Sequence, residues 1–118
     1  KNKFDSALII YDSILAYVPG HSLTDEIYYN KYNIFFKLNN LEDAILMLRS
    51  ILEHYPYDIL ADDAVFRLGN IYEYELQDID QAMYYYEKIL LEYQGSIYTS
   101  ESRKRFRELR GDLLNDTI

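Results

Sequence analysis

Three segments of this chain repeat one apolar pattern, and this repetition constrains the fold more than any other feature of the sequence. They begin at Phe4, Leu41 and Ile79. In each, an apolar residue stands three positions before an Ala, a large residue four after it, and an Ile three further on. The triplets are Ala7–Tyr11–Ile14, Ala44–Leu48–Ile51 and Ala82–Tyr86–Ile89, at intervals of 37 and 38 residues. The chain is therefore built from a repeated unit.

Each segment predicts an amphipathic helix, because its apolar residues recur at i, i+3, i+4 and i+7. The Ala is small enough to let a neighbouring helix approach. Pro19 and Pro56 follow the first two segments and predict their ends, and Gln94 stands at this place in the third.

Partner helices are expected at 24–38, 60–76 and 98–110, with Gly111 as the C-cap of the last. The polar pairs Asn39-Asn40 and Gln77-Asp78 predict tight turns, so successive helices should run antiparallel. We therefore expect six helices in an all-α chain.

The helix pair that contains Leu68-Gly69, Tyr72, Ala82, Tyr86 and Ile89 resembles a tetratricopeptide repeat. The resemblance extends from Phe4 to Arg110 and implies a right-handed superhelical solenoid of antiparallel helix hairpins. Lys31-Tyr32 stand where the family has Leu-Gly in the first complete pair. The spacing exceeds the usual period of about 34 residues, and lengthened repeats of this kind are similar to those of bacterial cell-envelope proteins. A periplasmic or cell-envelope location is thus favoured over a cytoplasmic one.

We expect one domain over 1–118, a fragment of a longer array. It should comprise a lone helix at 1–19, repeats at 20–56 and 57–94, and a C-terminal capping helix with a tail at 95–118. The first helix lacks its partner and could expose Leu8, Ile9 or Tyr11, which would favour self-association.

Candidate catalytic or metal-binding residues are few. The sequence has no Cys and two histidines, His21 in a predicted loop and His54 in the last turn of a predicted helix, where a histidine suits the helix dipole. Pairs of acidic residues at 25–26, 42–43 and 62–63 lie at helix starts, which the dipole also explains. We therefore predict no enzyme activity, no metal ligand, no cofactor and, from the lack of a long apolar run, no membrane span.

The resemblance implies that the first helix of each pair lines a concave groove. The partner-binding positions are then Tyr29, Asn33, Phe36, Lys37, Phe66, Asn70, Glu73, Tyr74 and Lys104, with Glu26, Asp63, Glu101 and Glu108 around them. Amides can pair with a peptide backbone and aromatic rings can anchor it. Packing between repeats is the alternative role of the aromatic rings. The acidic positions disfavour binding of a C-terminal carboxylate and favour a neutral or basic protein segment.

The cluster Arg103, Lys104, Arg105, Arg107 and Arg110 is the one basic landmark on a chain of net charge −8. Residues 1–102 carry 7 basic and 17 acidic side chains. The cluster could contact phosphates of nucleic acid or lipid, or it could belong to a solvated capping helix with Phe106 and Leu109 turned inward. The acidic surroundings favour the second interpretation, so no nucleic-acid partner is predicted.

These features predict a non-enzymatic protein–protein interaction scaffold that binds its partner through the groove. The alternative is a structural or oligomerisation segment of a larger cell-envelope protein, without a groove of its own.

Overall fold

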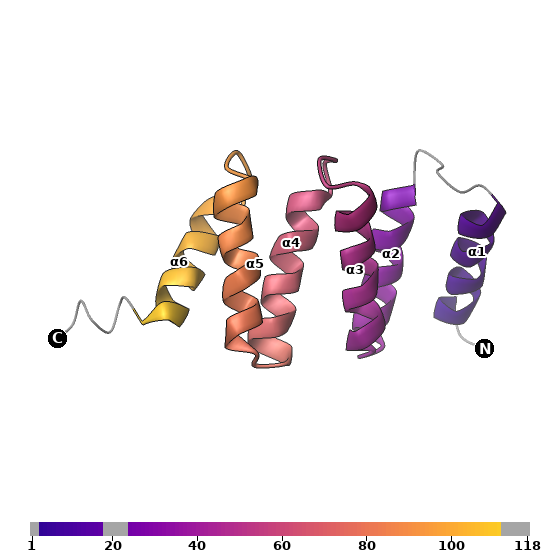
Figure 1. The fold of residues 1–118 in the computed structure, drawn as a ribbon. Helices are drawn as coiled ribbons and strands as arrows, with labels where there is room; N and C mark the ends of the chain where they lie inside the picture. The colour runs from indigo at the N-terminus through magenta and orange to yellow at the C-terminus, as the bar shows by residue number, and fades with distance from the viewer. Residues whose placement is uncertain (1–2, 18–23, 112–118) are drawn as a thin grey trace. The chain divides into compact units, whose positions relative to one another are not determined.

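The computed structural model describes residues 3–17 and 24–111, and its regular structure there is helical (Figure 1). The helices are α1 (Lys3–Tyr17), α2 (Thr24–Lys37), α3 (Leu41–His54), α4 (Ala61–Asn70), α5 (Ile79–Glu92) and α6 (Thr99–Arg110). A π-helix, η1 (Ile71–Glu75), continues α4. The predicted all-α class and its six helices are confirmed. Pro19, His21, the predicted loop at 20–22 and the tail at 112–118 lie outside the described residues.

The chain divides into two compact units, residues 1–60 and 61–118. In the first unit, α2 packs against both α1 and α3. In the second, α5 packs against α4, η1 and α6. Helices that follow one another in the sequence are therefore packed in pairs within each unit.

The same turn joins a helix pair in each unit. Asn39 and Gln77 adopt positive φ values of 59° and 53°, a conformation that Asn tolerates better than most residues. The next residues, Asn40 and Asp78, cap α3 and α5. Each side chain accepts a hydrogen bond from the backbone N–H three residues on, at 3.3 and 3.2 Å. The turns thus repeat at an interval of 38 residues, as the apolar triplets do.

The repeated triplets form the centre of each helix pair. Ala44, Leu48 and Ile51 of α3 are fully buried, and so are Ala82, Tyr86 and Ile89 of α5. The triplet of α1, Ala7, Tyr11 and Ile14, is half-buried. The predicted C-cap is also confirmed, because Gly111 has a φ of 93° and its N–H reaches the carbonyls of Arg107 and Glu108.

The π-helix accommodates one extra residue in the second unit. The N–H of Asn40 donates to the carbonyl of Phe35, five residues back, whereas that of Asp78 donates to Tyr72, six back, each at 2.8 Å. The N–H of Leu76 bonds the carbonyl of Ile71, five residues back, which is the π-helical pattern. The wider turn of backbone lets α4 keep its helical register while the connection to α5 stays the same.

The two units place their large core residue on opposite helices. Tyr86 of α5 lies against Gly69 of α4 in the second unit. At the equivalent positions of the first unit, Tyr32 of α2 is 6% exposed and Leu48 of α3 is fully buried. The first unit thus has Tyr on the first helix of its pair and Leu on the second, whereas the second unit has Gly and Tyr at these places.

Candidate protein-binding surfaces

A run of aromatic rings and polar side chains lies along α2 in the first unit. Asn33 and Lys37 are exposed, Phe36 is 38% exposed and Tyr29 is half-buried. The rings of Tyr29 and Phe36 flank that of buried Tyr32, with centroid distances of 5.2 and 6.0 Å. A buried ring therefore holds two more accessible ones in place. We call Tyr29, Asn33, Phe36 and Lys37 the α2 surface.

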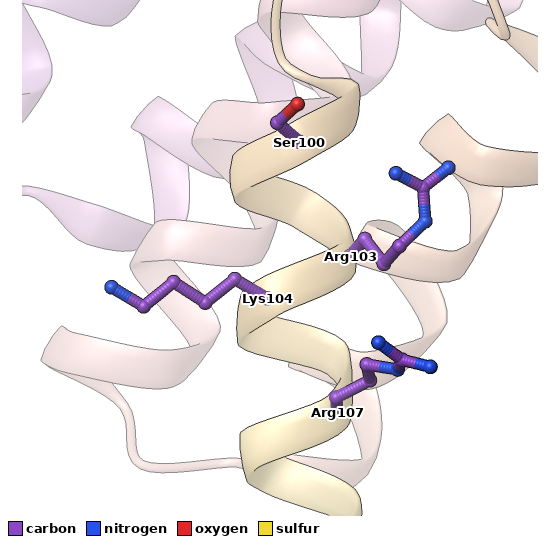
Figure 2. Close-up of a pocket in the computed structure, with 4 residues that line it drawn as sticks. All are labelled: Ser100, Arg103, Lys104 and Arg107. Atoms are coloured by element: carbon purple, nitrogen blue, oxygen red, sulfur yellow. The ribbon is translucent and has the colours of Figure 1, made fainter.

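The basic cluster on α6 separates into distinct environments. Ser100, Arg103, Lys104 and Arg107 line an open depression of about 350 Å³ (Figure 2). The guanidinium of Arg110 lies 4.9 Å from the ring centroid of Phe106. Phe106 and Leu109 are half-buried.

Phe66 lies inside the second unit. Its side chain is 8% exposed, and its ring stacks on that of Tyr98 at a centroid distance of 4.4 Å and an interplanar angle of 15°. Tyr98 is the N-cap residue of α6. This stack joins the start of α6 to α4.

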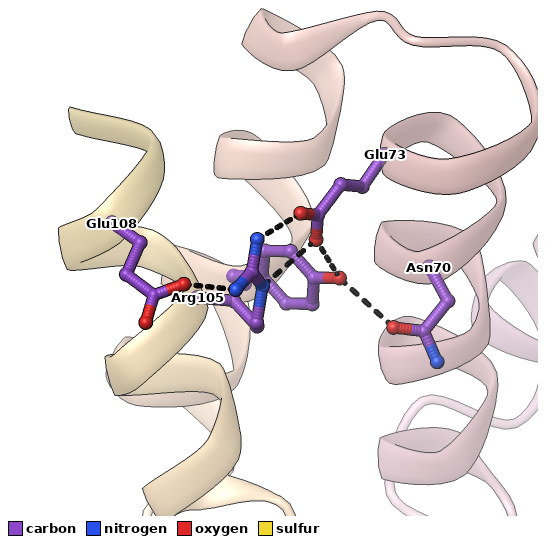
Figure 3. Close-up of polar contacts among 5 residues, drawn as sticks. Asn70, Glu73, Arg105 and Glu108 are labelled. Atoms are coloured by element: carbon purple, nitrogen blue, oxygen red, sulfur yellow. Dashed lines mark hydrogen bonds and ion pairs between the residues drawn. The ribbon is translucent and has the colours of Figure 1, made fainter. Parts of the chain in front are cut away.

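Asn70 and Glu73 take part in a polar network with Arg105 and Glu108 (Figure 3), which also includes the Tyr86 hydroxyl. The Tyr86 hydroxyl donates to Glu73 Oε1 at 2.8 Å and lies 2.9 Å from Asn70 Oδ1. The guanidinium of Arg105 donates through Nε to Glu73 Oε1 at 3.1 Å and through Nη2 to Glu73 Oε2. Its Nη1 donates to Glu108. Glu73 is thus held by α5 on one side and α6 on the other.

Burial determines the electrostatics of this network. The Glu73 side chain is 7% exposed and that of Arg105 is 18% exposed, and a buried carboxylate is stable only when its oxygens are paired. Burial raises the pKa of Tyr86, and the hydrogen bond to Glu73 raises it further. The hydrogen bond to Glu73 also raises the pKa of Arg105. The arrangement therefore fastens α6 to the preceding helices.

Hydrogen bonds and ion pairs within the chain offset part of the negative charge that the sequence predicts at the groove positions. Asp63 accepts from Arg67 Nε at 3.3 Å and from the Tyr98 hydroxyl. Glu73 and Glu108 both pair with Arg105. Glu26 and Glu101 are exposed.

Tyr74 and Lys104 are the more accessible of the predicted positions in the second unit. Tyr74 is 59% exposed, and the Arg105 guanidinium lies 5.9 Å from its ring centroid. Lys104 is exposed on α6. The structure thus brings Asn70 and Glu73 together and leaves Tyr74 and Lys104 on the surface.

Sequence reasoning did not find the partners Tyr98 and Arg105. Tyr98 lies 32 residues after its partner Phe66 on α4, and Arg105 lies 32 residues after its partner Glu73 on η1. The repeat interval is the signal that the sequence offers, because it predicts that α6 packs beside α5 as α4 does. It does not specify which side chains meet.

His54 is the candidate histidine that lies within the described residues, and it makes contacts inside its own unit. His54 Nδ1 lies 2.9 Å from the Ser50 carbonyl oxygen, and its ring stacks near Tyr28 at 6.2 Å. Within residues 3–17 and 24–111, three or more His, Cys, Asp or Glu side chains nowhere come together as a metal site. In the same residues, every helix is too short or too polar to cross a membrane.

Comparison with known proteins agrees with the geometry of the second unit. Residues 63–96, which cover most of α4, η1 and α5, match the family model of the tetratricopeptide repeat. No curated protein and no solved structure matches the chain. The matched range contains the Gly69–Tyr86 contact. It also contains Ala82 and Ile89, the other two residues of the α5 triplet. The chain therefore contains a tetratricopeptide repeat at residues 63–96.

Proposed function

We propose that this chain is a non-enzymatic scaffold that binds a neutral or basic extended segment of a partner protein through the α2 surface. A tetratricopeptide repeat suggests a protein-interaction scaffold. The finer proposal rests on the exposure of both Phe36 and Asn33. The ring of buried Tyr32 supports the ring of Phe36.

The chemistry of the α2 surface suits an extended peptide. The Asn33 amide can donate to and accept from a peptide backbone. Phe36 offers a flat apolar face that needs little ordering, because Tyr32 already fixes one side of it. Exposed Glu26 at the start of α2 adds a negative charge and favours a neutral or basic segment over an acidic one.

In the second unit, Tyr74 and Lys104 are the positions proposed to touch a partner directly. Phe66, Asn70 and Glu73 support them through the Tyr98 stack and the Arg105 network. Each unit is proposed to act through its own surface residues.

A peptide selection tests the proposal. A phage-displayed library of random peptides would be selected on the full chain, and the enriched peptides titrated against Asn33→Ala and Phe36→Ala. We expect a loss of affinity of about tenfold for each, since an interface anchor contributes above 1 kcal/mol. Leu46→Ala on α3, where Leu46 is 55% exposed, is the matched control and should bind normally. Failure to enrich peptides, or unchanged affinity in both variants, would refute the proposal.

A second candidate function is self-association as a segment of a cell-envelope assembly. Ile9 and Ile10 of α1 are 52% and 58% exposed, which favours this candidate. Light scattering over a range of concentrations should then show oligomers that Ile9→Lys with Ile10→Lys abolishes. A chain that stays monomeric at every concentration would rule this candidate out.

A further inference from the structure

The turn that leads from η1 into α5 (Figure 1) exposes three large apolar side chains among carboxylates. Tyr74, Leu76 and Ile79 are 59%, 45% and 40% exposed. Glu75 and Asp80, which lie between and beside them in the sequence, are also exposed. From Tyr74 to Ile79 the chain spans at most about 18 Å, so one short segment of a partner can contact all three apolar residues. We call residues 74–80 the turn surface.

Hydrogen bonds hold the backbone of the turn surface in one conformation. The N–H of Leu76 donates to the carbonyl of Ile71 at 3.0 Å. The N–H of Asp78 donates to the carbonyl of Tyr72 at 2.8 Å, and the Asp78 side chain accepts from the N–H of Gln81. A partner that binds here therefore has little backbone to order, which favours binding.

The two exposed carboxylates are available to a partner. Within residues 3–17 and 24–111, the carboxylates of Glu75 and Asp80 make no hydrogen bond or ion pair. The nearby cation is already paired, because the Arg105 guanidinium, 5.9 Å from the Tyr74 ring centroid, contacts both Glu73 and Glu108. The turn surface therefore presents negative charge next to apolar side chains.

The equivalent turn of the first unit carries a different charge. Lys37 corresponds to Glu75 when residues are counted from the turn, and to Tyr74 when they are counted from the helix start. The one residue that η1 adds thus places a ring and a carboxylate where the first unit has a single lysine. π-Helical segments are frequent at functional sites. Asn40 of the first unit is also replaced by an acid, Asp78.

The arrangement of charges distinguishes between classes of ligand. In the part of the chain that the structure describes, acidic side chains and histidines nowhere gather in threes as a metal site. Nucleic acids and anionic lipids would be repelled by the carboxylates of the turn surface. A protein segment that carries both cations and apolar side chains matches the charge and the exposed apolar residues together.

We propose that the turn surface binds a short basic segment of a partner protein that also carries apolar side chains. Lys or Arg side chains of the segment would pair with Glu75 and Asp80, and its apolar side chains would cover the three exposed apolar residues. Exposed ion pairs contribute little affinity, so the apolar contacts supply most of it and the carboxylates select the basic partner. The inference deepens the role proposed for Tyr74 and rests on it, but it does not depend on the α2 surface.

The test uses three short peptides with the same fluorescent label. One alternates Lys and Leu, the second replaces Leu by Ser, and the third replaces Lys by Glu. Each would be titrated against the full chain by fluorescence anisotropy. We expect the second and third peptides to bind about tenfold more weakly or worse, because each lacks one of the two kinds of contact.

Variants of the chain locate the binding of the Lys and Leu peptide. Glu75→Gln with Asp80→Asn should weaken it about fivefold, in line with the modest strength of exposed ion pairs. The matched control, Glu42→Gln with Glu53→Gln, removes two exposed carboxylates of the first unit and should leave binding unchanged.

An apolar pair of variants completes the test. Leu76→Ala should weaken binding of the Lys and Leu peptide, whereas Leu46→Ala, which removes a similarly exposed leucine of α3, should not. Urea unfolding checks that both variants are folded. The Glu75 and Asp80 variant changes exposed side chains, so it tests the proposal even if Leu76→Ala unfolds.

Three results would overturn the inference. The first is equal binding of the Lys and Ser peptide, or equal loss in the Glu42 and Glu53 variant, since general attraction to an acidic chain would then explain the binding. The second is weaker binding in Phe36→Ala with no change in the Glu75 and Asp80 variant, which would place the site on the α2 surface. The third is no peptide binding together with oligomers that the Glu75 and Asp80 variant abolishes, which would make a second copy of the chain the occupant.

Failure of the α2 surface would be seen separately. Peptides selected on the full chain would then bind Phe36→Ala normally, while the Lys and Leu peptide would still respond to the Glu75 and Asp80 variant.

Discussion

A Cβ atom at Gly69 would lie 2.8 Å from Cε1 of Tyr86, so the absence of a side chain on α4 and the ring on α5 are matched in size. The ring cannot easily retreat, because Tyr86 is fully buried and its hydroxyl is held by Glu73. Gly69→Ala should therefore lower the free energy of unfolding by about 1–3 kcal/mol. This is expected even though Ala is favoured over Gly in a helix by about 1 kcal/mol. Urea unfolding measures the change.

Two further variants make the Gly69 prediction specific. Gly95→Ala adds the same carbon where it would meet nothing within 4 Å, and it should leave stability nearly unchanged. Combining Gly69→Ala with Tyr86→Leu, the residue type at the equivalent position Leu48, should cost less than the two single changes added together. Additive costs would show that the contact does not limit packing.

Removing Arg105 should destabilise the second unit strongly. In Arg105→Met the Glu73 carboxylate would stay buried with its main partner lost, at a cost of about 3 kcal/mol. Arg103→Met, at an exposed position on the same helix, should change stability by less than about 0.5 kcal/mol. Thermal or urea unfolding compares the two. Similar effects of both changes would show that the Glu73 pair has no special role.

The raised pKa of Tyr86 predicts a loss of stability at alkaline pH. Tyrosine ordinarily has a pKa of 10.0, and burial with the Glu73 bond raises it in the folded state. Above pH 10 the unfolded chain therefore releases a proton that the folded chain keeps, so stability is complete below pH 10 and falls as the pH rises. The free energy of unfolding then falls by up to about 1.4 kcal/mol for each pH unit because of Tyr86. Tyr86→Phe should reduce the slope of unfolding free energy against pH by that amount, and an unchanged slope would contradict the assignment.

Ser102 offers a stabilising change. Its hydroxyl is fully buried and has no hydrogen-bond partner among residues 3–17 and 24–111. An unsatisfied buried polar group costs about 1–3 kcal/mol, and the equivalent residue of α4 is Ala64. Ser102→Ala should therefore raise the free energy of unfolding by about 1 kcal/mol in a urea titration. Ser100→Ala changes an exposed position two residues earlier, so it is the control and should have little effect on stability.

Local sequence patterns predicted the helices because the information was local. The Ala triplets indicated which faces of α3 and α5 are buried, and the Asn39-Asn40 and Gln77-Asp78 pairs indicated the turns. The π-helix was not predictable, because one extra residue between Asn70 and Gln77 leaves the apolar pattern almost unchanged. It becomes evident when the interval between the two turns is compared with that between their preceding helices.

The site positions were less predictable, because helical periodicity gives the face of a residue and not its partner. Asn33 and Asn70 occupy equivalent positions, yet Asn33 is exposed and Asn70 lies beside the Tyr86 hydroxyl. The difference follows from the residue on the second helix of each pair, which is Leu48 in the first unit and Tyr86 in the second. A Tyr on α5 reaches Asn70, whereas Leu48 at the equivalent place has no polar group to offer.

Mapping of amide chemical shifts by NMR tests the central claim most directly. A peptide selected on the full chain would be added to labelled protein, and the shift changes followed residue by residue. The account predicts that the largest changes cluster at Tyr29, Asn33, Phe36 and Lys37, and that Phe36→Ala reduces them at the same peptide concentration. Changes that cluster away from α2, or that are equally large in Phe36→Ala at the same peptide concentration, would contradict it.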